Sequence, residues 1–139
     1  MSEDGGAVTL HDDVGLMMKD TKQILVVEDY QPMAAAIESI LEINGYRALT
    51  APNGVEALHV MEGLTPDLII ADILMPEMNG YAFYEAVRKR SEWQAIPFIF
   101  LTSMAGREDI EKGRALGVES YITKPFDPED LLEAVRAEL

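Results

Sequence analysis

Polar side chains that could do chemistry follow four apolar runs of this sequence. Each run reads as a strand, and parallel strands place their carboxyl ends at one edge of a sheet, where ligands bind. Three carboxylates, two hydroxyls and one ammonium are therefore expected to converge there. In chain order they are Glu28, Asp29, Asp72, Thr102, Ser103 and Lys124.

The least ordinary of these residues is Asp72, which ends an apolar run that a neutral side chain would suit better. A buried carboxylate stays ionised only beside a cation or hydrogen-bond donors. Clustered carboxylates repel one another, and oxygen ligands without sulfur or histidine nearby favour Mg²⁺ as the ion that relieves this repulsion. An ionised Asp72 can attack phosphorus to form an acyl phosphate. Lys124 and Thr102 would offer positive charge and a hydroxyl donor to the phosphoryl oxygens.

Each residue alone also has an ordinary structural explanation. An acidic pair after a strand often caps the next helix, threonine is common in strands, and a lysine before proline is commonly a surface charge. The coincidence of complementary groups at four strand ends favours a phosphoryl site. The chain contains neither G-x-x-x-x-G-K-[ST] nor G-x-G-x-x-G, so the phosphoryl donor is expected to be another molecule.

The elements that must position these side chains alternate regularly from Gln23 onward. Three predicted strands are continuously apolar, which is typical of parallel strands covered by helices on both faces. Pro32 suits the first turn of the first predicted helix, and Gly45 suits its end. We therefore predict an α/β fold, a doubly wound five-stranded parallel sheet with five helices on both faces. The predicted strands are 24–27, 47–51, 68–71, 98–101 and 121–122, and the predicted helices are 32–44, 54–62, 81–89, 106–116 and 128–139.

The amino-terminal segment reads differently from the rest of the chain. A few apolar residues sit there at helical spacing, but Gly15 interrupts them. We therefore predict a flexible leader over residues 1–22, with a short partner-docking helix as the alternative. The alternating pattern runs through residues 23–139, which are predicted to form one domain.

The charge of the chain is strongly negative. It has 25 Asp and Glu against 11 Lys and Arg, a formal net charge of −14. Such a surface repels phosphate backbones and anionic lipids, so direct binding of nucleic acid or membrane is not expected. There is no cysteine, no secretion signal, and no apolar stretch long enough to cross a bilayer. A cytoplasmic location is expected.

The combined motifs closely resemble those of the receiver domains of two-component response regulators, especially chemotaxis receivers that stand alone. The resemblance covers residues 23–139 and implies the flavodoxin-like strand order 2-1-3-4-5. The spacings look like the family's, with 43 residues from Asp29 to Asp72, 30 more to Thr102 and 22 more to Lys124. The matching segments are Glu28-Asp29 after ILVV, Asp72 in LIIADILMPEMNG, Thr102-Ser103 after FIFL, and YITKPF around Lys124.

The resemblance implies a role for each site residue. Asp72 would be the phosphoacceptor. Asp29 and Asp72 would bind Mg²⁺ directly, together with the backbone carbonyl of Leu74, while Glu28 would act mostly through water. Pro76 and Gly80 would shape the loop that leaves the phosphoacceptor and enters the next helix.

Three further residues complete the implied site. Thr102 and Lys124 would contact the phosphoryl group. Tyr121 would be a switch aromatic that turns inward when Thr102 moves toward the phosphate, although it could also be an ordinary strand aromatic. The Lys124–Pro125 peptide bond is expected to be cis.

The resemblance also implies partners. A histidine kinase or a histidine phosphotransfer protein would supply the phosphoryl group. Because the chain ends at Leu139, directly after the last predicted helix, the output is expected to be contact with a downstream protein or a second copy, and not enzymatic turnover. The face formed by the fourth helix, fifth strand and fifth helix would make this contact. A receiver excised from a longer regulator or hybrid kinase would have the same sequence.

Two other functions stand as alternatives. A Mg²⁺-dependent phosphohydrolase with an aspartyl nucleophile commonly needs a second acid two residues later, where this chain has Leu74. A receiver-like module that binds partners without phosphorylation would be expected to lack a site residue, and none is missing. Leu74 and Met104 stand two residues after Asp72 and Thr102, and we predict that these bulky apolar side chains shield the acyl phosphate from water.

Overall fold

The structure is a computed structural model that describes residues 21–103, 107–118 and 120–139. The predicted leader lies almost wholly outside the described residues. Met104 also lies outside them. The leader and the shielding role of Met104 therefore stay predictions.

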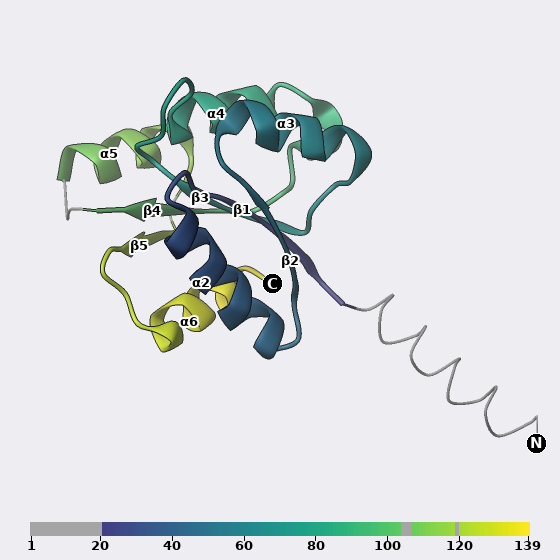
Figure 1. The fold of residues 1–139 in the computed structure, drawn as a ribbon. Helices are drawn as coiled ribbons and strands as arrows, with labels where there is room; N and C mark the ends of the chain where they lie inside the picture. Colours follow the sequence, from purple (N-terminus) through teal and green to yellow (C-terminus); the bar gives the residue numbers. More distant parts are fainter. Residues whose placement is uncertain (1–20, 104–106, 119) are drawn as a thin grey trace, which may run out of the picture.

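A parallel sheet forms the centre of the described part of the chain (Figure 1). Its five strands lie in the order β2-β1-β3-β4-β5, which confirms the predicted doubly wound fold and its strand order. Residues at the carboxyl end of β1 pair in register with the ends of β2 and β3, so these strands end at one edge. The strands are β1 (Gln23–Val27), β2 (Arg47–Ala51), β3 (Leu68–Asp72), β4 (Phe98–Thr102) and β5 (Tyr121–Thr123).

Helices cover both faces of this sheet. In the described chain, α2 and α6 lie on one face, and α3, α4 and α5 lie on the other (Figure 1). This arrangement follows from the right-handed crossovers that connect parallel strands. The helices are α2 (Gln31–Ile43), α3 (Gly54–Gly63), α4 (Gly80–Arg88), α5 (Arg107–Leu116) and α6 (Pro128–Glu138).

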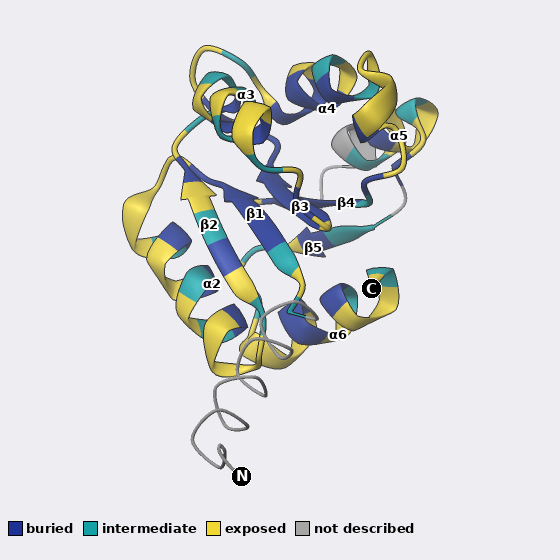
Figure 2. Ribbon diagram, turned by 90° about the vertical axis from the view of Figure 1, so that its right-hand side faces the viewer, coloured by how far each residue is buried: buried dark blue, intermediate teal, exposed yellow. Residues whose placement is uncertain are grey.

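The strand side chains supply two apolar cores, one on each face. Leu25 and Val27 point into the core under α3 and α4, whereas Ile24 and Val26 point into the core under α2 and α6. All four residues are fully buried, and Figure 2 shows most of β1 in the colour of buried residues. A strand with two buried faces has no position for a polar side chain, which explains why these runs are continuously apolar.

Local capping residues decide where several helices begin and end. The side chain of Asn53 accepts a hydrogen bond from the backbone N–H of Glu56 and so caps α3, and Asp127 forms a reciprocal capping box with Asp130 at α6. Helix α2 begins at Gln31, one residue before the predicted start, and keeps its proline within the first turn. Gly45 follows its end with a φ of 94°, a conformation that favours glycine.

One short element was not predicted from the sequence. A 3-10 helix, η1 (Ser91–Trp93), lies between α4 and β4 and buries its tryptophan. Its local sequence is polar, and its tryptophan packs into the core under α3 and α4. Among the described helices, none combines the length and the apolar composition that a membrane span needs.

Candidate functional site

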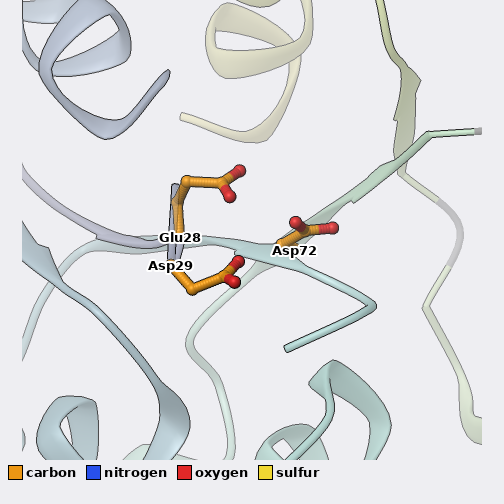
Figure 3. A group of neighbouring side chains, drawn as sticks. All are labelled: Glu28, Asp29 and Asp72. Carbon is orange, nitrogen blue, oxygen red and sulfur yellow. The ribbon is translucent and has the colours of Figure 1, made fainter. Parts of the chain in front are cut away.

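Three carboxylates meet at the edge of the sheet where β1 and β3 end. Val27 pairs with Ala71, so the residues that follow these two, Glu28 and Asp72, lie side by side at this edge. Glu28, Asp29 and Asp72 direct their carboxylates into the same space (Figure 3). One carboxylate oxygen from each residue lies within 4.8 Å of the others. The structure thus brings together the three acids that the sequence placed at strand ends.

Lys124 supplies positive charge to this cluster. Its Nζ donates hydrogen bonds to Oε1 of Glu28 at 2.9 Å and to Oδ2 of Asp72 at 3.0 Å. The Glu28 side chain is 1% exposed and the Asp72 side chain 9% exposed, while Asp29 is exposed to solvent. The backbone N–H of Lys124 donates to the carbonyl of Thr102 at 2.7 Å, which ties the lysine to the end of β4. The Lys124–Pro125 peptide bond is cis, as predicted.

The electrostatics of the buried pair reflect both burial and hydrogen bonding. Burial raises the pKa of Glu28 above its ordinary value of 4.5, although hydrogen bonds from Lys124 and the backbone N–H of Tyr30 oppose this shift. Burial alone would lower the pKa of Lys124, but its hydrogen bonds to Glu28 and Asp72 raise it above 10.5. The lysine therefore carries its charge at neutral pH, and one ammonium faces three acidic groups.

The donor set of this cluster fits a hard divalent cation. Its ligand atoms are carboxylate oxygens, with neither sulfur nor imidazole among them. Mg²⁺ prefers oxygen ligands, and a second positive charge would relieve the repulsion that one lysine leaves. Glu28, Asp29 and Asp72 are thus suitable residues to hold Mg²⁺.

A tight loop holds Asp72 against the start of α4. The N–H of Gly80 donates to the carbonyl of Ile73 at 2.8 Å, and the side chain of Asn79 caps α4 by accepting from the N–H of Ala82. A Cβ at Gly80 would lie 2.5 Å from the carbonyl oxygen of Asp72, so this close approach requires glycine. Leu74 lies on the same loop with 65% of its surface exposed.

Thr102 and Tyr121 lie on the neighbouring strands β4 and β5. Thr102 ends β4 and is buried, and it pairs with Thr123, the last residue of β5 and the residue before Lys124. Tyr121 pairs with Phe100, two residues before Thr102, and its half-buried ring packs 6.0 Å from the ring of Phe100. Thr102 thus lies at the edge that carries the carboxylates, whereas Tyr121 packs beside Phe100, two residues earlier in β4.

Comparisons with known proteins show the family to which this fold belongs. Residues 24–136 match the family model of the response regulator receiver domain. The chain belongs to this family. Receiver domains are signalling switches of two-component systems rather than dedicated enzymes; they typically bind Mg²⁺ and interact with histidine kinases and downstream proteins.

Curated relatives of this receiver domain differ in length. Protein PilG of Pseudomonas aeruginosa is 34% identical over 118 residues, which cover 85% of this chain and 87% of PilG. A protein named "Probable transcriptional regulator ycf27" from Guillardia theta is 35% identical over 91% of this chain but only 48% of its own length. The chain spans about half the length of the ycf27 proteins that it matches.

Solved structures show the same fold. The chemotaxis response regulator CheY4 of Vibrio cholerae superposes with a TM-score of 0.81 and 34% identity, over 86% of this chain and 99% of that one. The receiver domain of a signal transduction histidine kinase from Syntrophus aciditrophicus gives a TM-score of 0.79 and 36% identity, over 86% and 90% of the two chains. Receivers from both regulators and kinases are therefore similar to this chain.

Proposed function

We propose that this receiver domain is a phosphoryl-accepting switch and that Asp72 is its phosphoacceptor. The observation that carries the proposal is the position of Lys124 Nζ, which hydrogen-bonds Glu28 and Asp72 at the edge where Asp29 also points. This arrangement places a nearly buried carboxylate beside a fixed positive charge and beside two further acids that can bind a cation. A phosphoryl group needs such a surrounding when it is transferred.

The transfer begins when a carboxylate oxygen of Asp72 attacks the phosphorus atom of the donor. The bond between phosphorus and the donor breaks, its electron pair leaves with the donor, and an acyl phosphate forms on Asp72. Lys124 and the hydroxyl of Thr102 stabilise the negative charge on the phosphoryl oxygens. Asp29, Asp72 and the backbone carbonyl of Leu74 would hold Mg²⁺ directly and Glu28 mostly through water, and the ion would neutralise more of this charge.

The new charge at Asp72 shifts the balance between two conformations. Thr102 moves toward the phosphoryl group, Tyr121 changes its orientation, and the face formed by α5, β5 and α6 presents a different surface. The donor is a histidine kinase or a histidine phosphotransfer protein in the cytoplasm. A downstream protein or a second copy of the chain binds the changed face. The net charge of −14 opposes direct contact with nucleic acid or membrane.

The experiment that tests this proposal is intact mass spectrometry after incubation with acetyl phosphate and Mg²⁺. We expect the wild-type chain to gain the mass of one phosphoryl group, and we expect no gain in Asp72→Asn or after chelation of the metal. A folded wild-type chain that binds Mg²⁺ but gains no mass would overturn the proposal and favour a module that works without phosphorylation. Multiple turnover of a small phosphate ester would favour the phosphohydrolase.

Leu74 is predicted to lengthen the lifetime of the acyl phosphate. It stands two residues after Asp72, and its exposed apolar side chain can limit the approach of water to the phosphoryl group. We expect Leu74→Asn to shorten the half-life of the phosphorylated chain several-fold, measured by the loss of the phosphoryl mass with time. Ile43→Asn is the matched control, because Ile43 is an exposed apolar residue at the end of α2, outside the site. An unchanged half-life in a Leu74→Asn variant that also carries Met104→Asn would contradict the prediction.

A further inference from the structure

Tyr121 occupies a defined position against helix α5. Its hydroxyl lies 2.9 Å from the carbonyl oxygen of Val118 and 3.3 Å from that of Ile110, and its ring packs on Phe100. Both carbonyls belong to α5 or to the turn after it. We call this arrangement the docked position of Tyr121.

The docked position depends on the missing side chain of Gly113. A Cβ at Gly113 would overlap the Tyr121 hydroxyl and would lie 2.9 Å from Cζ and 3.1 Å from Cε2 of the same ring. Carbon atoms at such distances repel strongly, so the ring and a side chain at this position exclude each other. Gly113 is buried, and among the described residues outside the adjoining backbone of its own helix, the three atoms nearest to this Cβ position all belong to Tyr121.

The backbone gives no other reason for glycine at this position. Gly113 lies inside α5, where glycine weakens a helix relative to alanine. Gly117, by contrast, follows the helix with a φ of 106° and so has a conformation that favours glycine. Gly63 in α3 has open space around its Cβ position, so an alanine fits there. The room for Tyr121 is therefore the physical reason that distinguishes Gly113.

We propose that Gly113 provides the space that Tyr121 occupies in the docked position, and we call this space the seat of Tyr121. The lack of a side chain at Gly113 determines in what fraction of the molecules Tyr121 is docked. The proposal rests on the proposed function only in that Tyr121 is taken to report the phosphorylated state. Tyr121, Ile122 and Thr123 also line a groove between β5 and α6, together with Asp130 and Glu133. A ring that leaves the seat therefore changes the surface that a partner would bind. Gly113 thus acts as a positioning residue that works through Tyr121.

Urea unfolding of four variants tests the seat directly. We expect Gly113→Ala to lower the urea midpoint, whereas the matched control Gly63→Ala keeps or raises it because alanine favours helix. In a Tyr121→Ala background, Gly113→Ala should no longer lower the midpoint, since the ring that it excludes is gone. An equal fall with and without the Tyr121 ring would overturn the proposal, because the cost would then come from other contacts.

The orientation of Tyr121 can be measured in the same variants by ¹⁹F NMR of chains labelled with 3-fluorotyrosine. The signal that disappears in Tyr121→Phe identifies this residue. We expect Gly113→Ala to move that signal toward the shift of a solvent-exposed fluorotyrosine, and Gly63→Ala to leave it in place. An unmoved signal in Gly113→Ala would refute the seat. Gly113→Ala should still gain one phosphoryl mass at Asp72, so failure of the seat and failure of the phosphoacceptor give different results.

Discussion

Replacing Lys124 with methionine should lower the free energy of unfolding by about 3–5 kcal/mol at neutral pH, because breaking one partner of a buried ion pair leaves its charge uncompensated. Lys124 hydrogen-bonds both Glu28 and Asp72, and its own side chain is only 17% exposed. Methionine keeps much of the length of the lysine side chain but removes the ammonium. The two carboxylates would then face each other without a positive charge between them.

The pH dependence of this loss follows from the two shifted groups. Burial raises the pKa of Glu28 above its ordinary value of 4.5. The contribution of Glu28 to stability is therefore fully present below pH 4.5 and is lost as the pH rises through the raised pKa. In Lys124→Met the penalty should therefore shrink as the pH falls and Glu28 takes up a proton. In the wild-type chain, the raised pKa of Lys124 keeps its contribution fully present below pH 10.5, and the contribution is lost as the pH rises through that raised value.

Urea unfolding at several pH values, with and without Mg²⁺, measures these effects. Mg²⁺ should recover part of the stability of Lys124→Met, since it supplies the positive charge that the variant lacks. Lys89→Met is the matched control, because Lys89 is exposed and should change the stability little. A Lys124→Met chain as stable as the control at neutral pH would show that the ion pair is not needed to hold the carboxylates together.

Replacing Phe100 with alanine should cost about 3–5 kcal/mol of unfolding free energy, the range for a large core aromatic that leaves a cavity. Phe100 is fully buried in β4, and its ring contacts four other aromatic rings at centroid distances of 5.5 to 6.1 Å. Removal of this ring also takes away the surface on which Tyr121 packs. The affected partners are Tyr81, Tyr84, Phe98 and Tyr121.

Thermal or urea unfolding of Phe100→Ala, Phe100→Leu and Phe126→Ala measures the contribution of this ring. Leucine fills part of the cavity, so Phe100→Leu should lose less stability than Phe100→Ala. Phe126 is the matched control, since it is a half-buried phenylalanine on the other face of the sheet and should cost less to remove. Equal losses for Phe100→Ala and Phe126→Ala would contradict the central position assigned to Phe100.

The fold class could be predicted from the sequence alone, because burial on two faces restricts every residue of a strand to apolar types. The runs at 24–27, 68–71 and 98–101 carry no polar position, and the structure buries each of these strands between two layers of helices. Helix ends could also be predicted, because they depend on local residues. Asn53 caps α3 through its side chain, and Gly45 follows α2 with a backbone conformation that favours glycine. The strand order came from the family resemblance, and the structure confirms it.

The candidate site could also be predicted from the residue types at the strand ends, because parallel strands bring those ends to one edge. The sequence placed Glu28, Asp29 and Asp72 there, and the structure brings their carboxylates together. It did not reveal that Lys124 hydrogen-bonds both Glu28 and Asp72. A lysine side chain is long and flexible, so its partners depend on the path of β5 and not on its own neighbours in the chain.

Contacts between elements that are distant in sequence or lack a local pattern could not be predicted, because they depend on tertiary packing. The burial of Trp93 in a polar segment and the close approach of Gly80 to the carbonyl of Asp72 are examples. Gly113 is another, because a glycine in a charged helix gives no local sign that a tyrosine eight residues later fills its space. Hydrophobic periodicity indicates which face of an element is buried. It does not identify the side chain that fills a particular space, because that side chain comes from another element and depends on the packing between the two.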